Sequence, residues 1–287
     1  MSDESPSGVV ESPIGIFDSG FGGLTVARAA VDLMPNEDIV YLGDTARAPY
    51  GQKRIAQVRE YALQCLDRLD FHGVKALVIA CNTASSAVLR DARERYDVPV
   101  IDVIMPAARR ASLATRNGRI GVICTEATAR SRSYEDALAA VPGISLTTTP
   151  CPRFVEYVER GITGGPELEE LARRYLEPIR EAGCDTLILG CTHYPLLAGL
   201  ITLLLGEEVT LISSSEECAR ASYTALTRRG ILHTGPREPS RYFLTTGNAE
   251  KFERLGRRLM QGFVHDVHRV GMDEPPAPLG DLAVVKS

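Results

Sequence analysis

The 287 residues, 44% of them apolar and 24% charged, suffice for about two globular domains at roughly 150 residues each. The formal net charge of −5 argues against a broad basic surface, so direct nucleic-acid binding is not expected. The longest apolar stretch, residues 196–205, falls short of the ~20 residues that span a bilayer. The N-terminal residues do not show the charged and apolar regions of a signal peptide. We therefore expect a cytoplasmic protein without a membrane segment.

Short runs rich in Val, Ile and Leu recur along the chain, with helical patterns such as residues 54–69 between most of them. Alternating strands and helices are typical of parallel sheets. The strands are apolar on both faces, which fits a sheet covered by helices on each side. We expect strands at residues 14–17, 38–43, 76–80, 98–103, 119–123, 144–148, 186–190 and 209–213.

The same order of strands and polar strand ends occurs twice. Residues 14–19 correspond to residues 120–125 at an offset of 106, and Cys81 corresponds to Cys191 at an offset of 110. Such similar offsets indicate duplicated halves.

The duplication predicts an α/β fold of two pseudosymmetric domains, each with a mainly parallel sheet flanked by helices, and a site in the cleft between them. The run at residues 241–248 has no counterpart in the second half and is expected to complete the first domain. The first domain then comprises residues 1–103 plus 216–287, and the second comprises residues 104–215.

The seven cysteines include no CxxC pair and suit neither a disulfide framework nor a zinc knuckle. Cys65, Cys184 and Cys218 are expected to be buried small apolar residues. Cys81 and Cys191 differ, because each follows a strand and precedes hydroxyl or amide side chains. Ligands of open α/β sheets bind beyond the carboxyl ends of strands, so two facing domains would bring these thiols to one cleft from opposite sides.

Two opposed thiols suit proton transfer at a carbon acid. A thiol has a pKa of about 8.5, and a helix N-terminus can lower it to ~7 or below. A thiolate on one face of the carbon can remove a proton while a thiol on the other face delivers one, and the product is the mirror image. Nucleophilic catalysis needs only one cysteine with an adjacent base, so the second thiol favours proton transfer.

Four blocks of the sequence resemble the signature blocks of glutamate racemases, within the wider aspartate/glutamate racemase superfamily. The blocks are IGIFDSGFGGLTV, YLGDTARAPYG, ALVIACNTAS and LILGCTHYPLL, and the likeness runs from Gly15 to about Lys251. The resemblance implies a cofactor-independent, two-base racemase that interconverts L- and D-glutamate and supplies D-glutamate for peptidoglycan. Glutamate racemases are often dimers, so the resemblance is also compatible with a homodimer.

By the same resemblance, Cys81 and Cys191 match the family's catalytic pair. Asp18 lies where it can assist Cys81, and His193 lies where it can assist Cys191. Glu159 resembles an acidic position near the catalytic histidine. The residues that match substrate-binding positions, or in one case their duplicated equivalent, are Asp18, Ser19, Tyr50, Gly51, Asn82, Thr83, Thr125, Thr192 and His193.

Two features depart from the family's pattern or leave a choice open. Cys124 stands where the family commonly has glycine, and we expect it to narrow the approach to the site or to confuse thiol labelling rather than to act in catalysis. Glu156 lies close to Glu159 in the sequence and competes with it for the position near the histidine.

Other kinds of site fit the sequence less well. Cys191 and His193 could be metal ligands, but no third ligand is evident nearby, so no metal is expected. The glycines of residues 20–23 lack the spacing of a dinucleotide fingerprint, and none of the four lysines ends a strand facing a phosphate loop, so neither nucleotide nor pyridoxal phosphate is expected. His265 and His268, at helical spacing, are interpreted as a solvated surface pair.

Two alternative functions are also compatible with these sequence features. A superfamily relative that acts on aspartate or another carbon acid would carry the same two thiols, although His193 after Cys191-Thr192 resembles the glutamate branch. A regulator that binds a protein partner, such as a topoisomerase, would keep the fold with racemisation as a secondary activity.

Overall fold

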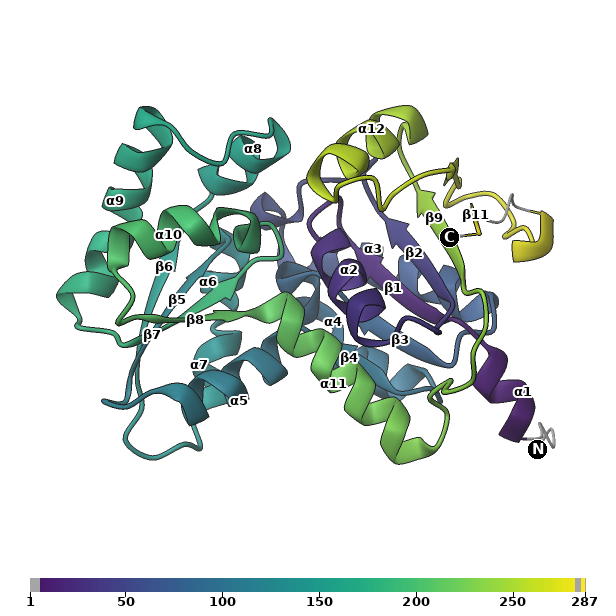
Figure 1. The fold of residues 1–287 in the computed structure, drawn as a ribbon, viewed down its shortest axis with the longest axis horizontal. Coiled ribbons are helices and arrows are strands. Elements are labelled where there is room, and N and C mark those ends of the chain that lie inside the picture. Colours follow the sequence, from purple (N-terminus) through teal and green to yellow (C-terminus); the bar gives the residue numbers. More distant parts are fainter. Residues whose placement is uncertain (1–5, 282–284, 287) are drawn as a thin grey trace.

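The computed structural model describes residues 6–281 and 285–286. These residues form two β-sheets flanked by helices (Figure 1). The larger sheet contains β1 (Ile14–Asp18), β2 (Ile39–Gly43), β3 (Ala76–Ile79), β4 (Val100–Asp102), β9 (Ser240–Thr245), β10 (Val267–Arg269) and β11 (Val285–Lys286). The smaller sheet contains β5 (Arg119–Cys124), β6 (Ser145–Pro150), β7 (Thr186–Gly190) and β8 (Thr210–Ser213). The eight strands expected before residue 214 all form, each within two residues of its predicted bounds.

Helices occupy most of the intervals between strands. They are α1 (Pro6–Glu11), α2 (Leu24–Leu33), α3 (Ile55–Phe71), α4 (Asn82–Arg95), α5 (Ile104–Ala114), α6 (Glu126–Ser131), α7 (Ser133–Leu138), α8 (Arg153–Glu159), α9 (Pro166–Glu181), α10 (Ala198–Leu205), α11 (Ser214–Arg229) and α12 (Ala249–Leu259). Short 3₁₀ helices are η1 (Tyr50–Gln52), η2 (Tyr194–Leu197) and η3 (Leu279–Asp281). Within the described residues, no helix has both the length and the apolar character needed to cross a membrane.

Local sequence explains these elements. In α3 the buried residues recur every three or four positions and form one apolar face, which includes Val58, Ala62, Cys65, Leu66 and Leu69. Helix α9 begins with Pro166, where the missing N–H has no intrahelical partner to lose. Strands β1, β2 and β7 are buried along their whole length because helices cover both faces of their sheets.

The strand order confirms the internal duplication. The larger sheet contains the order β2-β1-β3-β4, the smaller sheet has the order β6-β5-β7-β8, and all these neighbours are parallel. Strand β9 pairs with β2, as expected for the run at residues 241–248. The domain boundaries at residues 104 and 215 stay a proposal.

Three apolar clusters hold these layers together. One covers the α3–α4 face of the larger sheet, and another covers the α8–α10 face of the smaller sheet. The third joins both halves, since it includes Ile16 of β1, Val122 of β5 and Ala219 of α11. Helix α11 packs on both α2 and α5, so the two sheets share one core.

The helical interpretation of His265 and His268 is wrong. Helix α12 ends at Leu259, and His268 lies on the short strand β10. Gly262 has a φ of +84°, and such a positive φ does not continue a right-handed helix.

Candidate active site

The site lies where the strand order reverses in each sheet. From β1 the chain crosses to β2 on one side and then reaches β3 on the other, so the carboxyl ends of β1 and β3 border a crevice. Asp18 ends β1, and Cys81 follows β3. The smaller sheet repeats this arrangement, with Thr125 after β5 and Cys191 after β7.

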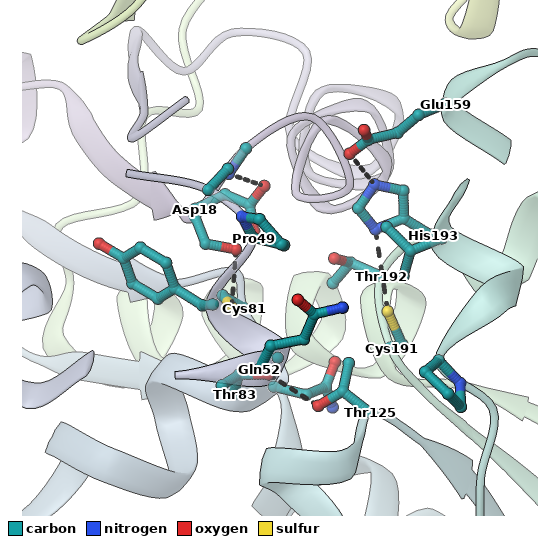
Figure 2. A pocket seen from close by; sticks show the side chains of 18 of the residues that line it. Asp18, Pro49, Gln52, Cys81, Thr83, Thr125, Glu159, Cys191, Thr192 and His193 are labelled. Atoms are coloured by element: carbon teal, nitrogen blue, oxygen red, sulfur yellow. Dashed lines mark hydrogen bonds and ion pairs between the residues drawn. The ribbon is translucent and has the colours of Figure 1, made fainter. Parts of the chain in front are cut away.

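One cavity of about 290 Å³ lies at these strand ends. Figure 2 shows Cys81 and Cys191 on opposite sides of it. Every residue predicted for the site lines this cavity: Asp18, Ser19, Tyr50, Gly51, Cys81, Asn82, Thr83, Thr125, Glu159, Cys191, Thr192 and His193. Small-molecule pockets span roughly 300–1,000 Å³, so the volume suits a small substrate better than a peptide chain.

Sequence reasoning missed several residues of the same cavity. Gln52 and Glu126 directly follow the predicted Gly51 and Thr125, so their position in the chain could have indicated them. Lys251 reaches the cavity from α12, and no local signal marks it because only tertiary packing brings that helix here.

Cys81 sits at the start of α4 in a buried position. Its Sγ accepts a hydrogen bond from the backbone N–H of Ala84 at 3.4 Å and lies 3.2 Å from Oγ of Ser19. Burial, assisted by the negative charge of Asp18, nevertheless raises the pKa of Cys81 to about 12. The helix N-terminus therefore does not lower this pKa, because desolvation of the thiolate outweighs the helix contribution.

Cys191 has a different environment, since a short turn and η2 follow it instead of a long helix. Its Sγ lies 3.8 Å from Nδ1 of His193, whose Nε2 lies 3.2 Å from Oε1 of Glu159. Burial lowers the pKa of His193, but the hydrogen bonds to Cys191 and Glu159 outweigh it and raise this pKa to about 10. His193 is therefore protonated at neutral pH, and a positive charge lies beside the Cys191 sulfur.

Asp18 is buried, and this burial raises the pKa of its carboxyl group. Its Oδ2 accepts hydrogen bonds from the backbone N–H of Gly20 at 2.9 Å and from the hydroxyl of Tyr41 at 3.3 Å. The side chain in hydrogen-bond contact with Cys81 is that of Ser19. Asp18 thus influences Cys81 through its charge, without a direct hydrogen bond.

Comparison with known proteins decides the family. A family model described as Asp/Glu/Hydantoin racemase matches residues 24–222. A glutamate racemase from Acidothermus cellulolyticus is 60% identical over 249 residues, which cover 86% of this chain and 95% of that protein. The chain belongs to the glutamate racemase family. The resemblance of the four sequence blocks is thereby confirmed.

Solved structures of this family agree in fold. The crystal structure of a glutamate racemase isoform from Bacillus anthracis has a TM-score of 0.87 at 40% identity and covers 90% of this chain and 97% of that chain. A Francisella tularensis glutamate racemase in complex with D-glutamate has a TM-score of 0.86 at 35% identity, covering 92% of this chain and 99% of that chain. The two-domain α/β architecture is therefore that of the family.

Glu156, Glu159 and Cys124 occupy different environments around the racemase site. Glu159 is the carboxylate that contacts His193, whereas Glu156 lines the cavity as an exposed residue. Cys124 is buried in the shared core, while Ile123 packs in the opposite cluster, because successive strand residues face opposite sides of a sheet. The prediction that Cys124 narrows the approach is therefore wrong, and its burial shields the thiol from labelling.

Several residues of the site also join the two halves. Nδ2 of Asn82 donates to the hydroxyl of Tyr134 at 2.8 Å, and Oγ1 of Thr83 lies 2.9 Å from Oγ1 of Thr125. Oγ of Ser214 donates to Oδ1 of Asn82 at 3.5 Å. Part of the hydrogen-bonding capacity of Asn82 and Thr83 is thus used between the halves.

We predict that Glu159→Gln lowers the pKa of His193 toward its ordinary value of about 6.5. The variant loses the carboxylate that helps to hold the imidazolium. Because folding raises this pKa, protonation of His193 stabilises the fold fully below about pH 6.5 and the contribution is lost as pH rises through about 10. The measurement is an NMR titration of the His193 ring carbons.

Glu156→Gln is the matched control for this titration. It removes a carboxylate from the same cavity that does not touch His193, and should change the pKa little. An equal fall in both variants would show that the local charge of the cavity, and not the Glu159 contact, sets the pKa.

Gly22→Ala should displace His193 from Cys191. A Cβ at position 22 would lie 2.4 Å from Nδ1 of His193 and 2.6 Å from Oγ1 of Thr192, closer than real contacts allow. A displacement of about 1 Å in a catalytic group can cost about 100-fold, so we expect a fall of this order in kcat for racemisation. Gly199→Ala on α10, where an added Cβ meets nothing within 4 Å, should keep the wild-type kcat. Wild-type kcat in folded Gly22→Ala would show that the placement of His193 does not limit turnover.

Proposed function

We propose that the protein interconverts L- and D-glutamate without a cofactor, by moving a proton between the α-carbon and two cysteine thiols. The observation that carries this proposal is the placement of Cys81 and Cys191 on opposite sides of one cavity, at equivalent strand ends. Relatives named glutamate racemase, and a family structure with D-glutamate bound, support glutamate as the substrate.

The protonation states set the first step of the reaction. Cys81, with a pKa of about 12, holds its proton at neutral pH, while the protonated ring of His193 lies beside the Cys191 sulfur. In one direction the Cys191 thiolate takes the α-proton as the C–H bond breaks. The Cys81 thiol then delivers its proton to the opposite face of the carbanion. The net result is an inverted carbon, a thiol at Cys191 and a thiolate at Cys81, and the other direction reverses each step.

The two flanking groups support the thiols in different ways. Asp18 acts on Cys81 through its charge, which adds to burial in raising the pKa of this thiol. His193 keeps its charge beside Cys191 because Glu159 holds the far side of its ring. Enantiomers have equal free energies, so kcat/KM must be the same in both directions at every pH. The difference between the two thiols can therefore make kcat and KM differ between the two directions, while kcat/KM stays equal in both.

Glutamate carries two carboxylates that need hydrogen-bond donors. Most of the donors that line the cavity are neutral hydroxyl, amide and backbone N–H groups. The N-terminus of the 14-residue helix α4 points backbone N–H groups toward the strand ends, which favours an anion there. The side chains that we propose for substrate binding are Ser19, Asn82, Thr83, Thr125 and Thr192, together with the loop at Tyr50 and Gly51.

From the family resemblance we further propose that the D-glutamate serves peptidoglycan synthesis in the cytoplasm. All seven cysteines are free, and reducing compartments keep thiols in that state. A homodimer stays a prediction.

We predict that Cys81→Ser and Cys191→Ser each lower racemisation by at least about 100-fold, since each removes the acid or base of one face. In D₂O the remaining thiol can still remove a proton and return a deuteron to the same face. Each variant should then incorporate deuterium into only one enantiomer without inverting it, and the two variants should act on opposite enantiomers. NMR of the α-position measures both exchange and inversion.

Cys184→Ser, which changes a buried cysteine outside the cavity, should keep full turnover. Near-wild-type racemisation in both directions by either single variant at Cys81 or Cys191 would contradict the two-thiol mechanism.

Substrate preference is the second test of the function. Aspartate lacks one methylene, so its distal carboxylate cannot reach the donors that hold that of glutamate. Each lost hydrogen bond to a charged group is worth about 1.5–3 kcal/mol, so kcat/KM should be about 10- to 100-fold lower for aspartate. Steady-state assays on both enantiomers of each acid measure this ratio, and a preference for aspartate would end the glutamate assignment.

A further inference from the structure

Asp44 is a fully buried carboxylate next to the cavity. It directly follows β2, and its backbone N–H donates to the carbonyl oxygen of Asp18 at 2.9 Å. Its neighbour Thr45 lines the cavity, but Asp44 itself does not, so it is not placed to touch a substrate. A buried carboxylate is costly unless it is paired and hydrogen-bonded, so its partners indicate what it holds in place.

Both oxygens of Asp44 have donors from loops near the cavity. Oδ2 accepts from the hydroxyl of Tyr50 and from Nε of Arg47, the latter at 2.7 Å. Oδ1 accepts from Oγ1 of Thr246, just after β9, at 2.7 Å. Arg47 is fixed in turn, because its guanidinium lies 4.2 Å from the centre of the Tyr61 ring. One carboxylate thus joins the loop after β2 to the segment that leads into α12.

The loop held by Asp44 forms one wall of the cavity. Residues 48–52 all line it, and Figure 2 shows Gln52 pointing into it. Gly51 meets the other half of the protein, since a Cβ at this position would lie 3.1 Å from Cβ of Thr125. The hydroxyl of Tyr50 is bound to Asp44, so Tyr50 contributes to the cavity through the position of its loop.

We propose that Asp44 is a positioning residue for substrate binding, which acts by holding the loop of Tyr50 and Gly51 against the cavity. The inference rests on the proposed function for its kinetic consequence. Cys81 and Cys191 lie on other elements, after β3 and β7. Loosening the loop should therefore weaken binding much more than it slows proton transfer.

The test is Asp44→Asn in the full-length protein. The amide is uncharged and has one acceptor oxygen, so it can accept from Thr246 or from Tyr50 and Arg47 but not from both sides, and it no longer forms an ion pair with Arg47. We expect KM to rise about 10-fold or more for both enantiomers of glutamate, with kcat within about threefold of wild type. An unchanged KM, or a loss confined to kcat, would overturn the inference.

Tyr50→Phe tests the same contact if Asp44→Asn fails to fold. It removes one hydroxyl and leaves the carboxylate in place, and it should also raise KM. In the double variant the two effects should not add, because Asp44 acts through Tyr50. Fully additive effects would show that the two residues act separately and would contradict the inference.

Asp67 offers a control with the same residue types at a more exposed position. It accepts from the hydroxyl of Tyr96 and from Nη2 of Arg95, both at 2.7 Å, so the same three residue types meet between α3 and α4. None of the three lines the cavity. Asp67→Asn and Tyr96→Phe should leave KM unchanged, and a rise equal to that of Asp44→Asn would show a general loss of stability instead of a positioning role.

A measurement without substrate separates this inference from the proposed function. In Asp44→Asn, amide hydrogen exchange should accelerate over residues 45–52 and stay unchanged in α4. If the wild type does not racemise glutamate, the proposed function fails, and the exchange result still decides whether Asp44 holds the loop. If the wild type racemises glutamate but the variant keeps both its KM and its loop protection, the inference alone fails.

Discussion

The apolar core shared by the two sheets holds the two halves of the site in register. Helix α11 packs on α2 and α5, and the apolar cluster around them includes β1 from one sheet and β5 from the other. Protein interiors are close-packed, so this cluster fixes how the strand ends of the two halves face each other. Two thiols 110 positions apart thereby border a single cavity. Without that packing, each cysteine would be a polar residue at the end of an isolated sheet.

The two halves are alike in topology but opposite in charge around their thiols. In the first half, the carboxyl of Asp18 lies at the end of β1 and disfavours negative charge on Cys81. The equivalent position in the second half is Cys124, which is buried in the core, and the charged group near Cys191 is the imidazolium of His193. One thiol thus lies near a carboxyl group, while the other lies beside an imidazolium. The duplication explains why the two sides of the site have the same topology, and the different residues at equivalent positions explain why their charges differ.

Much of the protein was predictable because the relevant signals are local. Apolar runs and their spacing depend only on neighbouring residues, so they predicted the strands, the parallel sheets and the duplicated order. Repeated strand ends with cysteine and hydroxyl side chains, with the resemblance of the blocks around them, indicated the residues that line the cavity. Two other predictions were wrong for identifiable physical reasons. His265 and His268 have helical spacing, but the positive φ of Gly262 does not continue the helix that precedes them. Cys124 packs in the core because successive side chains along a strand face opposite sides of the sheet.

The α/β architecture, its internal duplication and the equivalent positions of Cys81 and Cys191 could therefore be predicted from local patterns in the sequence. Three features depend on the folded arrangement: burial raises the pKa of Cys81, Glu159 rather than Glu156 contacts His193, and Thr246 donates to Asp44. The physical reason is distance along the chain. Desolvation and hydrogen bonds between residues tens to hundreds of positions apart depend on how the layers pack, and no local pattern records that packing.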